Sequence, residues 1–107
     1  MKKDEVLDTA KTYVCGPREQ TYGSASDNFG RIARLWSAYL SVPVSASDVA
    51  CMMILLKMSR LNTTPEHMDS WIDIAGYAAC GGEVSSVVEE ASSTLCGPQA
   101  VCKDYNV

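Results

Sequence analysis

The chain has 107 residues, about one domain, and its 47% apolar and 21% charged residues exclude a disordered chain. Thirteen acidic residues against nine basic ones give a net charge of −4, which argues against a long nucleic acid as partner. No run approaches the ~20 apolar residues of a membrane span, and the start has no apolar signal stretch, so we expect a cytoplasmic protein without a membrane partner.

The first predicted helix covers Asp4 to Val14, where apolar residues recur at helical spacing. Cys15-Gly16-Pro17 is expected to end it, because glycine favours a helix C-terminus and proline cannot continue the hydrogen-bond ladder. Arg18 to Asp27 is predicted to be a loop, since it contains Gly23 and several small residues. The same loop carries the aromatic residue Tyr22.

The second predicted helix covers Asn28 to Leu40 and is capped by Ser26 or Asp27. Its buried side is expected to be one apolar stripe with helical spacing. That stripe contains Phe29, Ile32, Ala33, Trp36 and Tyr39 or Leu40.

The third predicted helix begins after Ser45, where Asp48 completes a capping box, and closes at Asn62-Thr63. Its segment Val49 to Leu56 is apolar on every face. A helix of that kind is central in a bundle or shared with a second subunit. We therefore expect a homo-oligomer that associates through this helix.

The fourth predicted helix starts at Thr64-Pro65-Glu66 and runs to about Cys80, where Gly81-Gly82 ends it. Gly76 permits the close approach of another backbone or a ligand. The side expected to be buried contains Met68, Trp71, Ile72, Ala75 and Ala79. Asp69, Asp73 and Tyr77 form a second stripe beside the first.

A weaker fifth helix is predicted over Val84 to Leu95, with a frayed tail after it. The fold prediction is an all-α, compact bundle of four to five helices. Residues 1–83 form the helical domain, and residues 84–107 add a C-terminal helix and tail.

The cysteines and the histidine give no sign of a disulfide framework or a zinc site. The five cysteines are Cys15, Cys51, Cys80, Cys96 and Cys102, and no CxxC pair exists. Cys51 and Cys80 lie in apolar stretches and are expected to be buried. His67, the single histidine, is expected to be a surface or capping residue. We predict no metal, no cofactor and no catalytic residue.

The polar residues that end one helix and begin the next form a candidate ligand-binding site. It comprises Arg18, Tyr22, Lys57, Arg60, Asp69, Asp73 and Tyr77. The cations are suited to a phosphate, the carboxylates and Tyr77 to sugar or base edges, and Tyr22 to stacking on a base. The alternative is a salt-bridge network between neighbouring helices.

Two rival functions stay open. All-helical nucleotide pyrophosphohydrolases hold Mg²⁺ with four acids from two helices. Asp69 and Asp73 supply one half of such a set, and the second and third predicted helices lack the other half. The second rival is a protein-binding module that blocks a host factor through an exposed apolar patch.

Four motifs together resemble a family of small phage and prophage proteins of unknown function. They are Arg18-x-x-x-Tyr22-Gly23, Asn28-Phe29-x-x-Ile32-Ala33-x-Leu35-Trp36, Asp48-Val49-Ala50-x-Met52-Met53-Ile54-Leu55-Leu56-Lys57-Met58-x-Arg60 and Asp69-Ser70-Trp71-Ile72-Asp73-Ile74-Ala75-Gly76-Tyr77. A looser pattern is similar to the helical nucleotide-modification-associated domain, which leaves an accessory role in nucleotide modification open beside the pyrophosphohydrolase alternative. The resemblance spans residues 18–83 and implies a viral protein that acts in the bacterial cytoplasm near nucleotide metabolism or signalling.

The hypothesis that follows is a non-enzymatic nucleotide binder. Such a protein would sequester a host immune signalling nucleotide, either a cyclic oligonucleotide or an ADP-ribose derivative, and so block antiviral defence. Sequestration requires tight binding and no turnover.

Overall fold

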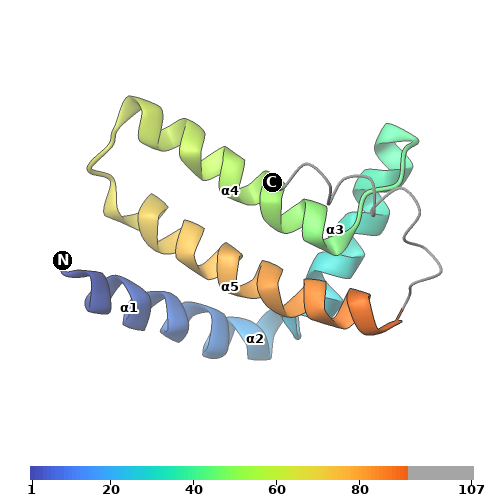
Figure 1. Ribbon diagram of the computed structural model, residues 1–107, viewed down its shortest axis with the longest axis horizontal. Coiled ribbons are helices and arrows are strands. Elements are labelled where there is room, and N and C mark those ends of the chain that lie inside the picture. Colours follow the sequence, from blue (N-terminus) through green and yellow to red (C-terminus); the bar gives the residue numbers. More distant parts are fainter. Residues whose placement is uncertain (92–107) are drawn as a thin grey trace.

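The computed structural model describes residues 1–91, apart from the side chains of Tyr22 and of residues 87–91. This part of the chain contains five helices and no strand, which confirms the predicted all-α bundle (Figure 1). The helices are α1 (Lys3–Cys15), α2 (Pro17–Tyr22), α3 (Ala25–Leu40), α4 (Ala46–Thr63) and α5 (Met68–Ala91). None of these described helices is long and apolar enough to cross a membrane.

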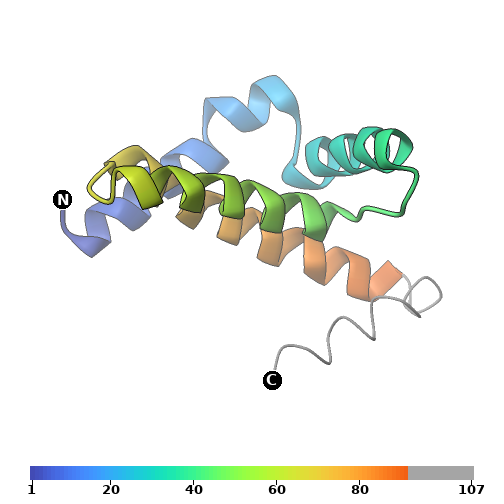
Figure 2. The same cartoon turned by 90° about the horizontal axis from the view of Figure 1, so that it is seen from above.

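The longest helix, α5, lies between α1 and α4 (Figure 1). α4 runs antiparallel to α5, with Ser47 Oγ 2.7 Å from Ser85 Oγ near one end and Lys57 paired with Asp73 nearer the connecting turn. α1 follows the other side of α5, and α3 packs across the end of the bundle opposite that turn (Figure 2). α4, which contains the all-apolar segment Val49 to Leu56, is therefore a flanking helix, and the central position belongs to α5.

The core forms where α3 meets α4. Phe29, Ala33, Val49 and Ala50 are buried together there. Tyr77 is among the α5 residues that pack against this cluster. The predicted apolar stripe of α3 is thus confirmed at its first turns. The stripe does not extend to the last turn, because Tyr39 and Leu40 lie beyond the core and are exposed.

The start of α4 follows the prediction. The Ser45 hydroxyl accepts a hydrogen bond from the Asp48 N–H at 3.0 Å, and the Asp48 carboxylate accepts one from the Ser45 N–H at 3.0 Å. This reciprocal capping box satisfies two backbone donors that would otherwise lack partners.

The predicted start of the next helix at Thr64 was wrong. Thr64 caps the end of α4 instead, since its N–H donates to the Arg60 carbonyl at 2.9 Å. A turn follows, and α5 begins at Met68. His67 stands before that first residue and is exposed, with its Nδ1 2.8 Å from Ser70 Oγ, so the expected surface histidine is confirmed.

The predicted loop from Arg18 to Asp27 was partly wrong, because it contains α2 and the start of α3. Pro17 occupies the first position of α2, where its fixed φ suits a helix and its missing N–H costs nothing. The same Gly-Pro pair therefore ends α1 and starts α2. α3 begins earlier than expected, because the Ser24 hydroxyl caps it by accepting from the Asp27 N–H.

Gly81-Gly82 does not end a helix as predicted, and α5 continues through it to Ala91. Packing against α4 sustains the helix there: Gly81 faces Ala50, and Val84 is 1% exposed. The predicted fifth helix from Val84 is therefore the continuation of α5. Its last part, residues 92–95, lies outside the described residues.

Three burial predictions were also wrong. Cys51, Trp71 and Ala79 are exposed, whereas Ile72 is 3% exposed as expected. The Trp71 ring extends over the turn before α5, where its Nε1 donates to the Pro65 carbonyl at 2.9 Å. For the two α5 residues, the cause is that α5 packs against both α1 and α4, so a single apolar stripe read from the sequence does not mark its buried surface.

Candidate functional site

A cavity of about 290 Å³ lies among α1, α2, the first turns of α3 and the middle of α5. α1 and α2 contribute Tyr13, Val14, Arg18 and Glu19, followed by Gly23 at the end of α2, and the start of α3 contributes Ala25, Asn28 and Phe29. α5 contributes Ile72, Asp73, Gly76, Tyr77 and Cys80. Among the described residues, α4 contributes none.

Gly76 determines how closely α1 approaches α5 beside the cavity. A Cβ atom built on Gly76 would lie 3.1 Å from Val14 Cγ1, which is too close for an unadjusted contact. The prediction named another backbone or a ligand, whereas the group that approaches Gly76 most closely is a side chain of α1. This contact places the end of α1, and the α2 residues that follow it, over the Asp73–Tyr77 segment of α5.

The cavity has an aromatic wall formed by Phe29 and Tyr77. Their ring centroids are 6.3 Å apart and the rings are tilted by 38°. Phe29 is 6% exposed and belongs to the core, so the wall is rigidly supported. A third ring, that of Tyr13, lines the α1 side. Such rings offer an aromatic ligand both offset-stacked and edge-to-face contacts.

Arg18 is the cation that α2 brings to the cavity. Its Cζ lies 5.3 Å from the centroid of the Tyr13 ring, within the range of a cation–π contact. The contact holds the guanidinium beside the cavity. An arginine held in this way is suited to bidentate binding of a phosphate or carboxylate.

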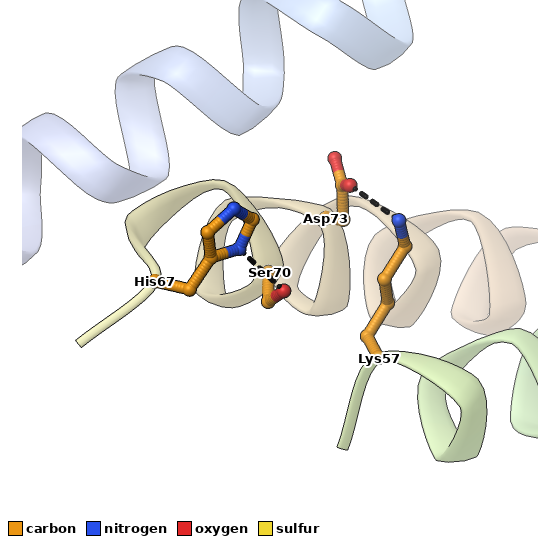
Figure 3. A network of polar contacts seen from close by, with 4 residues as sticks. All are labelled: Lys57, His67, Ser70 and Asp73. Atoms are coloured by element: carbon orange, nitrogen blue, oxygen red, sulfur yellow. Dashed lines mark hydrogen bonds and ion pairs between the residues drawn. The ribbon is translucent and has the colours of Figure 1, made fainter. Parts of the chain in front are cut away.

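Asp73 is held by an ion pair with Lys57 of α4. Lys57 Nζ lies 2.9 Å from Asp73 Oδ2, and the two side chains are 12% and 22% exposed. Figure 3 shows the second carboxylate oxygen directed away from Lys57. The pair compensates the charge of Asp73 and leaves it a free acceptor oxygen on a cavity-lining residue.

The seven residues of the candidate site do not all come together. Arg18, Asp73 and Tyr77 line the cavity, and Lys57 reaches it through Asp73. Arg60 and Asp69 are exposed and lie outside the lining. The Tyr22 side chain lies outside the described part of the chain, although the next residue, Gly23, lines the cavity.

Sequence reasoning missed several residues that line the cavity. Tyr13 lies at the end of α1, and Phe29 and Ile72 were counted only as core residues. One signal was available: Arg18 follows Tyr13 by only five residues, across the Gly16-Pro17 pair. Asn28, at the position predicted to start the second helix, had no signal that separated it from an ordinary helix residue.

Cys80 lies where the cavity meets the core. Burial raises the pKa of its thiol, and the negative charges of Glu83, Cys15 and Glu19 raise it further. The thiol is therefore neutral and less nucleophilic than an exposed cysteine. The part of the chain that the structure describes contains no group of three or more His, Cys, Asp or Glu placed to hold a metal ion.

A family model for a domain of unknown function, DUF6378, matches residues 5–85. The chain belongs to this family. The chain is 41% identical to the Gene 55 protein of Mycobacterium phage D29 over 87 residues, which cover 81% of this chain and 56% of that protein. The Gene 55 protein of Mycobacterium phage L5 is 49% identical over 74 residues, which cover 68% of this chain and 47% of that protein. No solved structure matches.

These matches confirm the resemblance to a phage protein family of unknown function. The chain spans about half the length of the curated relatives it matches. The DUF6378 match begins within α1, earlier than the module expected from Arg18, and extends past Cys80. It therefore includes every residue that lines the cavity.

Proposed function

We propose that this protein binds a nucleotide in the cavity between α1, α2, α3 and α5 and sequesters it without converting it. The ligand would be a host immune signalling nucleotide in the bacterial cytoplasm. The observation that carries the proposal is the composition of the cavity. It joins an aromatic wall, a positioned guanidinium and a charge-compensated carboxylate within one space of about 290 Å³.

Each part of a nucleotide has a matching group. The base packs against Phe29 and Tyr77, whose rings are already fixed by the core. The Asn28 amide and the free oxygen of Asp73 offer donors and acceptors to the base edge or the sugar hydroxyls. Arg18 binds the phosphate. A mostly apolar cavity with a few polar groups is the usual form of a small-molecule site.

Sequestration is a function that a binding site alone can perform. The curated relatives are phage proteins, and a phage benefits from removing a signal that activates host defence. Removal requires only that the protein binds more tightly than the host effector does, at sufficient concentration. The cavity groups named above bind and orient a ligand, and the proposal assigns none of them a chemical step.

The test is calorimetry of the purified chain against a panel of nucleosides, 5′-mononucleotides, cyclic mononucleotides, cyclic dinucleotides and ADP-ribose. We expect at least one nucleotide to bind with micromolar or tighter affinity, and we expect chromatography after denaturation to recover it unchanged. Absence of binding across the panel would remove the proposal. Release of pyrophosphate or another product would replace it with the enzyme alternative.

A pair of matched variants locates the binding. Ala25→Trp puts a large ring at the cavity lining, whereas Ala38→Trp puts the same ring on an exposed position of the same helix. We expect Ala25→Trp to abolish binding and Ala38→Trp to leave it unchanged, with both chains helical by circular dichroism. Equal binding by the two variants would place the ligand elsewhere.

A further inference from the structure

The size of the cavity matches a ligand of about one nucleotide unit. Ligand sites commonly range from ~300 to ~1,000 Å³, and this cavity, at about 290 Å³, is at the small end. Val14, Phe29 and Ile72 form its inner walls on the α1, α3 and α5 sides, and the last two are almost fully buried. The cavity is open to solvent on its remaining side, so a second base and sugar would extend out of it.

The charges limit the ligand further. Among the described residues that line the cavity, Arg18 is the one cation, and Glu19 and Asp73 are the acids. Lys57 compensates Asp73 through its ion pair, so a bound anion meets one available guanidinium and the uncompensated Glu19. A single negative charge matches Arg18. A second charge would have no partner and would be repelled by Glu19.

We infer that the ligand is a nucleoside cyclic monophosphate, a molecule with one base and one singly charged phosphodiester. This inference rests on the proposed function and narrows it. The cyclic ester fixes the phosphate close to the sugar, so base and phosphate reach the aromatic wall and Arg18 within one short span. A 5′-monophosphate carries a charge of about −1.5 to −2 at pH 7, and triphosphates and cyclic dinucleotides carry more charge or a second base.

The first test compares affinities at pH 7.5 by calorimetry. We expect the best of the four common 3′,5′-cyclic mononucleotides to bind at least about tenfold more tightly than its own 5′-monophosphate. We expect cyclic dinucleotides and ADP-ribose to bind more weakly still. If one of those larger ligands binds most tightly, the inference fails while the proposed function stands; if no nucleotide binds, the proposed function fails.

The second test uses the ionisation of the ligand. A phosphomonoester loses its second proton near pH ~6, whereas a cyclic phosphodiester has no second proton to lose. Lowering the pH from about 7.5 to about 5.5 should therefore strengthen binding of the 5′-monophosphate and leave the cyclic nucleotide nearly unchanged. Tyr13, Glu19, Asp73, Tyr77 and Cys80 also face the cavity, and the cyclic nucleotide is the internal control for their titration.

The third test removes the cation. We expect Arg18→Gln to lower the affinity for the cyclic nucleotide about ten- to a hundredfold, which is the range for one charge-assisted contact. The affinity for the uncharged nucleoside should change by no more than about twofold. Arg31→Gln is the matched control, because Arg31 is exposed on α3 outside the cavity lining. Equal losses for nucleotide and nucleoside would mean that Arg18 supports the fold, and would overturn its role at the phosphate.

Discussion

At the scale of single residues, Asp73 connects the packing of the bundle with the chemistry of the cavity. Its Oδ2 is held by Lys57 on the neighbouring helix, while the residue itself lines the cavity. A carboxylate fixed in this way loses little rotamer freedom when a ligand binds. The ion pair and the cavity are thus parts of one arrangement, although the sequence analysis treated them as alternatives.

Cys80 provides a chemical probe of the cavity. We expect it to react with iodoacetamide at pH 8 more slowly than the exposed Cys51, because the raised pKa of Cys80 leaves little thiolate. Peptide mass spectrometry measures both rates in the same sample. A bound nucleotide should slow the alkylation of Cys80 further and leave the alkylation rate of Cys51 unchanged. Equal protection of the two cysteines would show a global change of stability rather than occupation of the cavity.

Sequence reasoning found some site residues and could not find others for a clear reason. Spacing identifies which residues of a helix share a face, so Asp73 and Tyr77 were found together. Spacing does not say which neighbouring helix covers that face or how far the contact extends. Asp69 therefore joined the prediction although it is exposed one turn before the cavity.

At the scale of helices, α5 is central because small residues allow its neighbours to approach. Gly76 meets Val14 of α1, and Gly81 meets Ala50 of α4, where an added Cβ would lie 3.0 Å from the alanine Cβ. The apolar surface of α4 favoured either a central position or a shared subunit interface for that helix. Close packing depended on small side chains instead, and their effect is visible only once the partner helix is known.

The two adjacent glycines allow a controlled test of this packing. Gly82→Ala should stabilise the fold by about 0.5–1 kcal/mol, because an added Cβ there has no neighbour within 4 Å and alanine favours the helix. Gly81→Ala should stabilise the fold less than Gly82→Ala does, or destabilise it, because the buried Ala50 Cβ cannot rotate away from the added Cβ. Urea denaturation measures both. Equal stabilisation by the two variants would contradict the close contact of α4 and α5.

The helix boundaries show where local signals suffice. The capping box at Ser45 and Asp48 was predicted correctly, because all of its hydrogen bonds lie within four residues. Gly81-Gly82 was misread as a helix end, because the packing that carries α5 through it comes from α4, some thirty residues away.

At the scale of the whole molecule, α4 leaves one apolar strip uncovered. Met52, Leu55 and Leu56 lie at helical spacing and are 39%, 60% and 45% exposed. The homo-oligomer expected from the sequence stays a prediction, and this strip is the surface that it would use. A second copy that covered the strip would bury apolar area at little cost in polar groups.

Light scattering after size exclusion tests this prediction at micromolar concentration. We expect a mass of at least two chains for the wild type and of one chain for Leu55→Glu. Leu7→Glu is the matched control, since Leu7 is 63% exposed on α1, away from the strip. A monomeric wild type, or dissociation by both substitutions, would contradict an oligomer built on α4.

The most direct measurement is a crystal structure of the chain with the tightest-binding nucleotide of the panel. We expect electron density for the base against Phe29 and Tyr77, with the phosphate at the Arg18 guanidinium and the Lys57–Asp73 pair intact. Density at the exposed end of α4, beside Arg60 and Asp69 with the cavity empty, would contradict the account.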